Sequence, residues 1–115
     1  MRVLSSDREA GLSRALLAGA SVAALTMGER GVLWLERSAY SEIRSYPAFP
    51  VRAVDTLAAG DVFHGAYALA IARACPVDEA MRFASAAAAI KCTRAGGRGG
   101  APSLAEVEAF LQQFP

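Results

Sequence analysis

A glycine followed by an acidic residue, Gly60-Asp61, is the first place where this sequence could do chemistry. An apolar helical pattern follows, so Asp61 is expected in the first turn of a helix, where unpaired N–H groups and the helix dipole favour negative charge. The N–H groups of Ala59, Gly60 and Asp61 could hold a phosphate, because Gly60 lets an anion approach the backbone closely. The Asp61 carboxylate could accept a proton from a hydroxyl that attacks a phosphoryl group.

A simpler interpretation of the same pair is purely structural. Asp61 would only cap the helix and Gly60 would only turn the chain. Taken alone, the two residues favour this interpretation. The surrounding segment changes the balance.

The segment from Asp55 to Tyr67 reads Asp-Thr-Leu-Ala-Ala-Gly-Asp-Val-Phe-His-Gly-Ala-Tyr. It resembles the second signature of the PfkB family of ribokinase-like carbohydrate kinases, Asp-Thr-x-Gly/Ala-Ala-Gly-Asp-x-Phe. The resemblance implies that Asp61 is the catalytic base and that Ala59 and Gly60 form the anion hole. It also implies ATP with Mg²⁺ as the phosphoryl donor and a small sugar as the acceptor.

Two further segments resemble nucleotide-contacting parts of the same family. The turn Thr-Met-Gly-Glu-Arg-Gly is similar to the family's Thr-x-Gly-x-x-Gly turn near the nucleotide phosphates and ribose, and implies nucleotide contacts for Thr26, Gly28 and Gly31. The alanine-rich stretch 82–90 resembles the wall of the adenine pocket and implies Ser85 as an adenine-side neighbour. Without the signature, the turn would be a weak signal and the stretch an ordinary core helix.

A monovalent cation site is a further implication. Some ribokinase-like enzymes bind such a cation beside the anion hole through the first Asp of the signature and nearby carbonyls. The resemblance maps this site to Asp55, the Leu57 carbonyl and carbonyls near Lys91, Arg94 and Gly96, and implies K⁺. The glycine-rich loop here is longer, which leaves its register open. Alternatively, Asp55 only braces its loop through local hydrogen bonds.

Several other polar side chains have competing interpretations. His64 follows one helical turn after the acidic residue of the motif and is expected to be a partly buried helix histidine, not a second acid or base. Arg94 and Arg98 either contact a phosphate or anionic sugar or are simply solvated. Cys75 and Cys92 are isolated and are expected to be buried thiols without a zinc or disulfide role.

The elements before the motif are expected to supply a helix and a sheet. A capping box predicts a helix over 6–18, and the apolar run 21–26 predicts a strand buried on both faces, as in a parallel sheet. A tight turn should follow at 27–31. The segments 32–35 and 40–46 then indicate further strands in a hairpin or meander.

The motif itself is expected between a strand and a helix. The run 51–54 would be the strand, and the helix would extend through Ile71 until Cys75-Pro76. Asp78 is the expected cap of the next helix, which runs to Ile90. A capping box over 103–106 predicts the last helix.

Composition indicates one compact domain over residues 1–115. The chain is 54% hydrophobic and 20% charged, with a net charge of +1. Neither nucleic acid nor an anionic membrane is expected as a partner, because no face is rich in Lys or Arg. The apolar stretches are too short to span a bilayer and no signal peptide is indicated, so a cytoplasmic location is expected.

The resemblance implies an α/β fold, the C-terminal part of a ribokinase-like (Rossmann-like) α/β/α sandwich. No segment resembles the family's early Gly-Gly sugar motif or its β-sheet lid, so the lid and the N-terminal half are expected to be absent. Two alternatives to a catalytic segment stay open. One is a non-catalytic remnant that binds nucleotide, and the other is a structural module that self-associates into a homo-oligomer through an exposed sheet edge.

Overall fold

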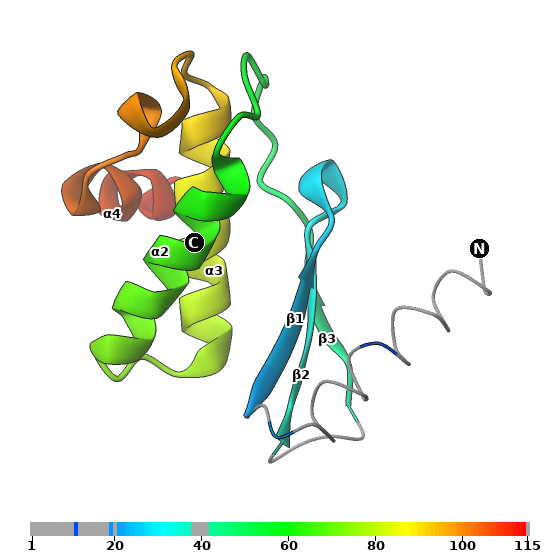
Figure 1. Cartoon of the computed structure of the whole chain (residues 1–115). Coiled ribbons are helices and arrows are strands. Elements are labelled where there is room, and N and C mark those ends of the chain that lie inside the picture. The colour runs from blue at the N-terminus through cyan, green and yellow to red at the C-terminus, as the bar shows by residue number, and fades with distance from the viewer. Residues whose placement is uncertain (1–10, 12–18, 20, 38–41, 115) are drawn as a thin grey trace. The chain divides into compact units, whose positions relative to one another are not determined.

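The computed structural model describes residues 11, 19, 21–37 and 42–114, and the chain divides into two compact units, Met1–Pro47 and Ala48–Pro115 (Figure 1). Each unit has an apolar cluster of its own. The helix expected over 6–18 falls outside the described residues except for Gly11, as do residues 40 and 41 of the expected third strand. The single domain expected over 1–115 stays a prediction.

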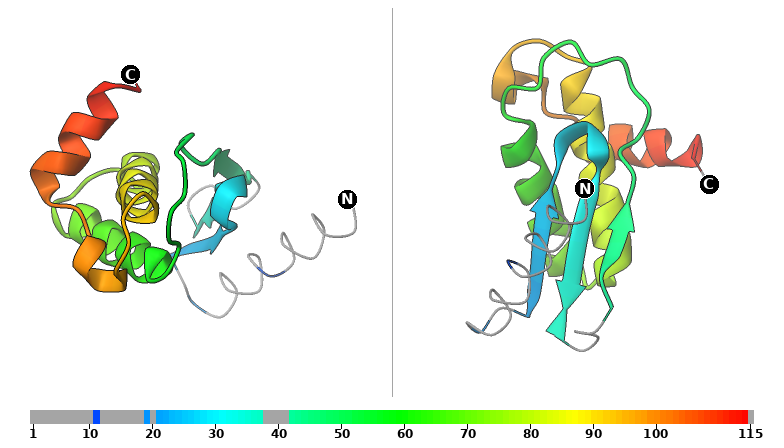
Figure 2. Two further views of the ribbon diagram at one scale, coloured as in Figure 1. Left: turned by 90° about the horizontal axis from the view of Figure 1, so that it is seen from above. Right: turned by 90° about the vertical axis from the view of Figure 1, so that its right-hand side faces the viewer.

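The first unit contains a three-stranded sheet with strands β1 (Val22–Thr26), β2 (Val32–Glu36) and β3 (Arg44–Tyr46) (Figure 2). The order is β1-β2-β3, and both pairs are antiparallel, with Ala23 opposite Leu35. The expected meander is therefore confirmed. The buried Ala23 and Leu35 form the centre of this unit's apolar cluster.

The parallel arrangement expected for the first strand is wrong. β1 pairs antiparallel with β2 because the two are joined by only five residues, whereas a parallel pair needs a crossover of a dozen or more. The strand is also not buried on both faces, since Ala24 is exposed. The expected tight turn is confirmed as a short 3-10 helix, Gly28–Arg30. Gly28 and Gly31 have φ angles of 56° and 93°, which glycine adopts without steric cost.

The second unit contains three helices, α2 (Ala59–Ala72), α3 (Val77–Cys92) and α4 (Leu104–Gln112). α2 and α3 lie side by side and antiparallel, and α4 runs crosswise to them (Figures 1 and 2). The three helices expected from the sequence are confirmed. The capping box between Ser103 and Glu106 is present at the start of α4.

Two local expectations in the second unit are wrong. Residues 51–54 form no strand; instead the N–H groups of Val54 and Asp55 both donate to the Cys92 carbonyl, at 2.6 and 3.0 Å. Pro76 is the N-cap of α3, and Asp78 lies inside its first turn. Proline suits this boundary because its fixed φ favours the start of a helix and it needs no N–H partner.

Small side chains let the helices of the second unit approach one another closely. Ala80, Ala84 and Ala86 of α3 are each 0% exposed. Ala86 belongs to a cluster with Val107 of α4 and aromatic side chains that include Phe49 and Phe110, whose rings meet edge to face. Among the described helices, none combines the length and the apolar character that crossing a membrane requires.

Candidate active site

A left-handed residue sets the start of α2. Ala58 is the N-cap with φ 66°, and its carbonyl accepts a hydrogen bond from the Val62 N–H at 3.0 Å. A left-handed conformation turns the chain sharply and is strained for a residue with a Cβ. This explains why glycine suits the same position of the motif. Asp61 follows in the first turn of α2 and is exposed.

The backbone donors before Asp61 are not equivalent. The Ala59 N–H donates to the Thr56 carbonyl at 3.1 Å, within the loop. The Gly60 N–H has no backbone partner in the described part of the chain. Gly60 is exposed, and a Cβ added there would meet nothing within 4 Å. Gly60 is therefore an accessible donor at this helix start, whereas the Ala59 N–H is already engaged.

A pocket of about 560 Å³ lies beside Asp61 within the second unit. Asp61 and His64 of α2, Phe83 of α3 and Pro102 before α4 contribute to its wall. His64 is exposed, so the expectation of a partly buried histidine is wrong. It lies on the solvent side of α2, with its ring edge-on to Phe63 at 6.0 Å between centroids.

Asp55 links three segments through all its polar groups. Its carboxylate accepts the N–H of Leu57 at 2.9 Å and that of Gly96 at 3.3 Å. Its own N–H donates to Cys92, and its carbonyl accepts from Lys91. The Leu57 N–H, then the Gly96 N–H and the nearby Lys91 charge, lower the pKa of Asp55. Asp55 therefore braces the loop that leads into α2. Its role as a cation ligand stays a prediction.

Lys91 is a functional candidate that the sequence analysis considered only as the position of a backbone carbonyl near the cation. Its side chain is 0% exposed, and its Nζ donates to the carbonyls of Asp55 at 3.1 Å and Arg94 at 2.9 Å. The signal in the sequence was a charged residue directly after the alanine-rich run 84–90 of the helix. Such a residue must find polar partners when the helix is buried.

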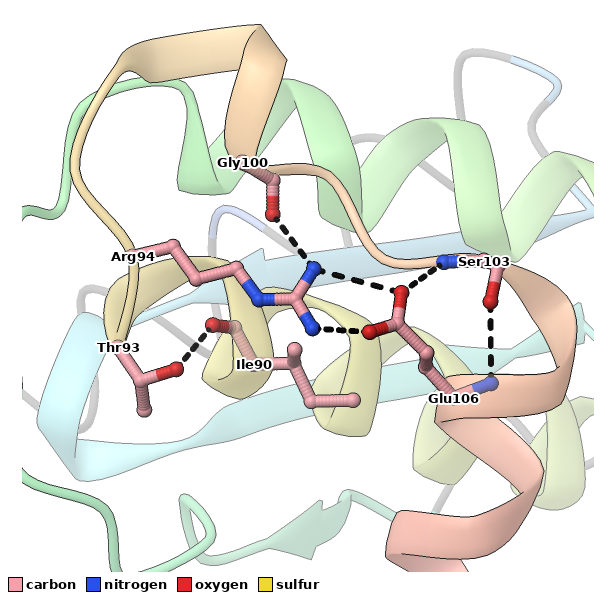
Figure 3. Close-up of polar contacts among 6 residues, drawn as sticks. All are labelled: Ile90, Thr93, Arg94, Gly100, Ser103 and Glu106. Carbon is pink, nitrogen blue, oxygen red and sulfur yellow. Dashed lines mark hydrogen bonds and ion pairs between the residues drawn. The ribbon is translucent and has the colours of Figure 1, made fainter.

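Arg94 is held by the start of α4 (Figure 3). Its guanidinium forms an ion pair with Glu106 and also lies 3.4 Å from the Gly100 carbonyl. Glu106 accepts the Ser103 N–H at 2.8 Å, and Arg94, followed by this capping bond, lowers the pKa of Glu106 to about 2. Arg94 therefore closes the glycine-rich loop onto α4. The side chain of Arg98 lies outside the described part of the structure.

The remaining candidates are spread over both units. Thr26, Gly28 and Gly31 belong to the first unit, at the end of β1 and in the turn after it. Ser85 is half-buried on α3 in the second unit and does not line the pocket. Whether these residues meet around a nucleotide stays a prediction.

The described cysteines and acidic residues form no cluster of metal-binding type. Cys75 and Cys92 are free thiols, half-buried where full burial was expected. The described residues contain no group of three or more His, Cys, Asp or Glu side chains that could hold a metal ion.

Solved structures similar to this chain are kinases of the ribokinase fold, and they define its class. A ribokinase from Thermotoga maritima is 41% identical, with a TM-score of 0.83 over 90% of this chain and 34% of its own. A putative ribokinase II from Escherichia coli, solved with ATP and Mg²⁺, is 28% identical, with a TM-score of 0.77 over 87% of this chain and 33% of its own.

The family follows from the sequence match. The model described as "pfkB family carbohydrate kinase" matches residues 2–104. The ribokinase of Bacillus subtilis is 41% identical over 87 residues, which cover 76% of this chain and 29% of the relative. Other curated relatives are a ribokinase and a deoxyribokinase. This chain belongs to the pfkB family of carbohydrate kinases, which are transferases, and it spans about a third of the length of these relatives.

Proposed function

We propose that this chain carries the ATP side, the anion hole and the catalytic base for ATP-dependent phosphorylation of a sugar hydroxyl. The observation that carries the proposal is the position of Asp61, exposed in the first turn of α2, directly after the left-handed Ala58 and on the wall of a pocket. The ribokinase and deoxyribokinase relatives support a small sugar as the acceptor.

In the proposed reaction Asp61 accepts the proton of the sugar hydroxyl. The hydroxyl oxygen forms a bond to the γ-phosphorus of ATP as the bond from that phosphorus to the ADP oxygen breaks. A carboxylate in this role aligns the hydroxyl and removes its proton as the new bond forms. The exposed position of Asp61 leaves its carboxylate accessible to a hydroxyl in the pocket.

Gly60 has the anion-binding role in this proposal. Its N–H lies in the first turn of a fourteen-residue helix, where the helix dipole stabilises negative charge. The missing side chain leaves room for a phosphoryl oxygen to reach the backbone. Ala59 would contribute its N–H only by sharing it with the Thr56 carbonyl.

The nucleotide side of the proposal adds the residues for which the family resemblance implies ATP contacts. Thr26, Gly28 and Gly31 would contact the phosphates and ribose, and Ser85 would lie beside the adenine. Mg²⁺ would bind mainly through the ATP phosphates, as it commonly does in kinases. The Escherichia coli relative solved with ATP and Mg²⁺ supports this donor.

Calorimetric titration with ATP and Mg²⁺ tests the proposed anion hole at Gly60. Gly60→Asp places a side chain and a negative charge at the proposed anion site, and we expect it to abolish the binding heat. Ala68→Asp is the matched control, because it adds the same charge at an exposed position of the same helix. Equal heats from wild type and Gly60→Asp would refute the proposed anion hole. Concentration-dependent association without any nucleotide response would favour the self-associating module.

A further inference from the structure

The side chain of Lys91 buries a positive charge at the end of α3. Lys91 is 0% exposed and is the one charged residue classed as buried among the residues described. A buried ammonium group is costly unless its charge and its N–H donors are compensated. Here the carbonyl oxygens of Asp55 and Arg94 accept its hydrogen bonds, at 3.1 and 2.9 Å.

These two residues belong to the set that the family resemblance maps to a monovalent cation. An ammonium group carries the same single positive charge as K⁺ and attracts the same carbonyl oxygens. Lys91 already takes the backbone carbonyls of two residues in this set, and the Asp55 carboxylate accepts the N–H groups of Leu57 and Gly96. The residues present therefore do not fit a separate K⁺ ion at this place. We propose that the Lys91 ammonium group stands in for the monovalent cation, so that this site needs no K⁺.

The surroundings fix the ammonium group in place. A Cβ added at Gly100 would lie 3.0 Å from Lys91 Cδ and 3.2 Å from Cε, so the lysine stem passes directly beneath this glycine. The Asp55 carboxylate is turned to the N–H groups of Leu57 and Gly96, and it still feels the Lys91 charge. The glycine-rich loop therefore closes over the lysine instead of leaving room for an ion.

Lys91 acts as a positioning residue in this arrangement. It ties the residue that opens the motif, Asp55, to the loop after α3, and α2 begins four residues later, at Ala59. A fixed positive charge near this loop also favours the negative charge of a phosphate group. The positioning role of Lys91 in catalysis rests on the proposed function. The proposal that its ammonium group replaces K⁺ does not.

Thermal unfolding in KCl and in choline chloride of equal ionic strength tests the replacement without any nucleotide. We expect the wild type to melt within about 1 °C in the two salts, because no cation site is open. Lys91→Ala removes the charge and leaves space beside the two carbonyls. It should melt lower in choline chloride and gain about 4–8 °C in KCl.

Lys91→Met is the matched variant, because it fills the space without the charge. It should melt low in both salts. Selective stabilisation of the wild type by KCl would overturn the inference, and so would a Lys91→Ala protein that gains nothing from KCl or is unfolded in both salts. A Lys91→Ala protein that folds only in KCl would support it.

ATP titration of the wild type in the same two salts is a second measurement. Equal affinities support the inference, and an affinity that needs K⁺ overturns it. Absence of ATP binding in both salts would count against the proposed function alone. The melting temperatures in the two salts test separately whether Lys91 replaces K⁺.

Discussion

The carbonyl oxygen of Asp55 accepts a hydrogen bond from Lys91 Nζ at 3.1 Å, across 36 residues of the chain. This contact joins the loop that precedes α2 to the end of α3. The N–H groups of Val54 and Asp55 reinforce it by donating to the Cys92 carbonyl. The start of the candidate catalytic helix is thus held by the C-terminal end of its neighbour.

Gly100→Ala should destabilise the second unit by about 1–3 kcal/mol, because the new Cβ would overpack the buried Lys91 stem. It would lie 3.0 Å from Lys91 Cδ and 3.1 Å from Arg94 Cβ. Urea unfolding measures the loss. Gly99→Ala is the matched control, since a Cβ there meets nothing within 4 Å. Equal losses from both variants would contradict the packing of the lysine beneath Gly100.

Ala58→Gly should stabilise the chain by about 0.5–1 kcal/mol. The left-handed φ of 66° strains an alanine. Relief of this strain should outweigh the larger conformational entropy that a glycine loses on folding. Ala68→Gly, at an exposed position inside the same helix, should instead lose about 0.5–1 kcal/mol. Both changes can be measured by chemical denaturation. Losses of the same size from the two variants would show that Ala58 is not left-handed in solution.

Glu106→Gln should lower the melting temperature at neutral pH but not in strong acid. The folded pKa of Glu106 is lowered from 4.5 to about 2, chiefly by Arg94. The contribution of its charge is therefore fully present above pH 4.5 and is lost as the pH falls through about 2. The difference in melting temperature between the two proteins should shrink over this window.

Glutamine at position 106 can still accept the Ser103 N–H, so Glu106→Gln isolates the charge from the capping bond. Glu108→Gln removes one negative charge from the same exposed helix and serves as the control. A difference that stays constant from pH 7 to pH 2 would mean that the ion pair with Arg94 does not stabilise the protein.

Local chemistry explains why parts of the structure were predictable. The capping box at Ser103 and the glycines at 28 and 31 act within a few residues, so their geometry follows from the sequence. The motif around Asp61 was similarly readable because its loop and helix are contiguous. The pfkB family and the ribokinase fold expected from this motif are confirmed.

Contacts between distant segments were not predictable in the same way. The side chain of Lys91 bonds to Asp55, and that of Arg94 pairs with Glu106. Neither pairing has a fixed spacing, because each depends on how α3 packs against a loop or helix elsewhere in the chain. The strand expected over 51–54 failed for a related reason. The Val54 N–H, like that of Asp55, bonds to the Cys92 carbonyl at the end of α3, so it is not available to a neighbouring strand.

His64→Gln should leave sugar phosphorylation within about tenfold of the wild-type rate, because loss of a general acid or base usually costs about 10²–10⁴-fold. His64 shares the pocket wall with Asp61 but is exposed on α2. The assay can use a chimera in which this chain replaces the matching segment of the Bacillus subtilis ribokinase. A hundredfold loss would make His64 part of the chemistry.

Asp61→Asn in the same chimera, with ATP and ribose, tests the central claim most directly. Asparagine preserves the size and one acceptor oxygen of the side chain but cannot take up the proton, so the turnover rate should fall by at least about 10²-fold. ATP affinity should stay within about threefold. Asp78→Asn, in the first turn of α3, is the control and should keep the wild-type rate. An Asp61→Asn enzyme that turns over at nearly the wild-type rate would contradict the assignment of Asp61 as the base.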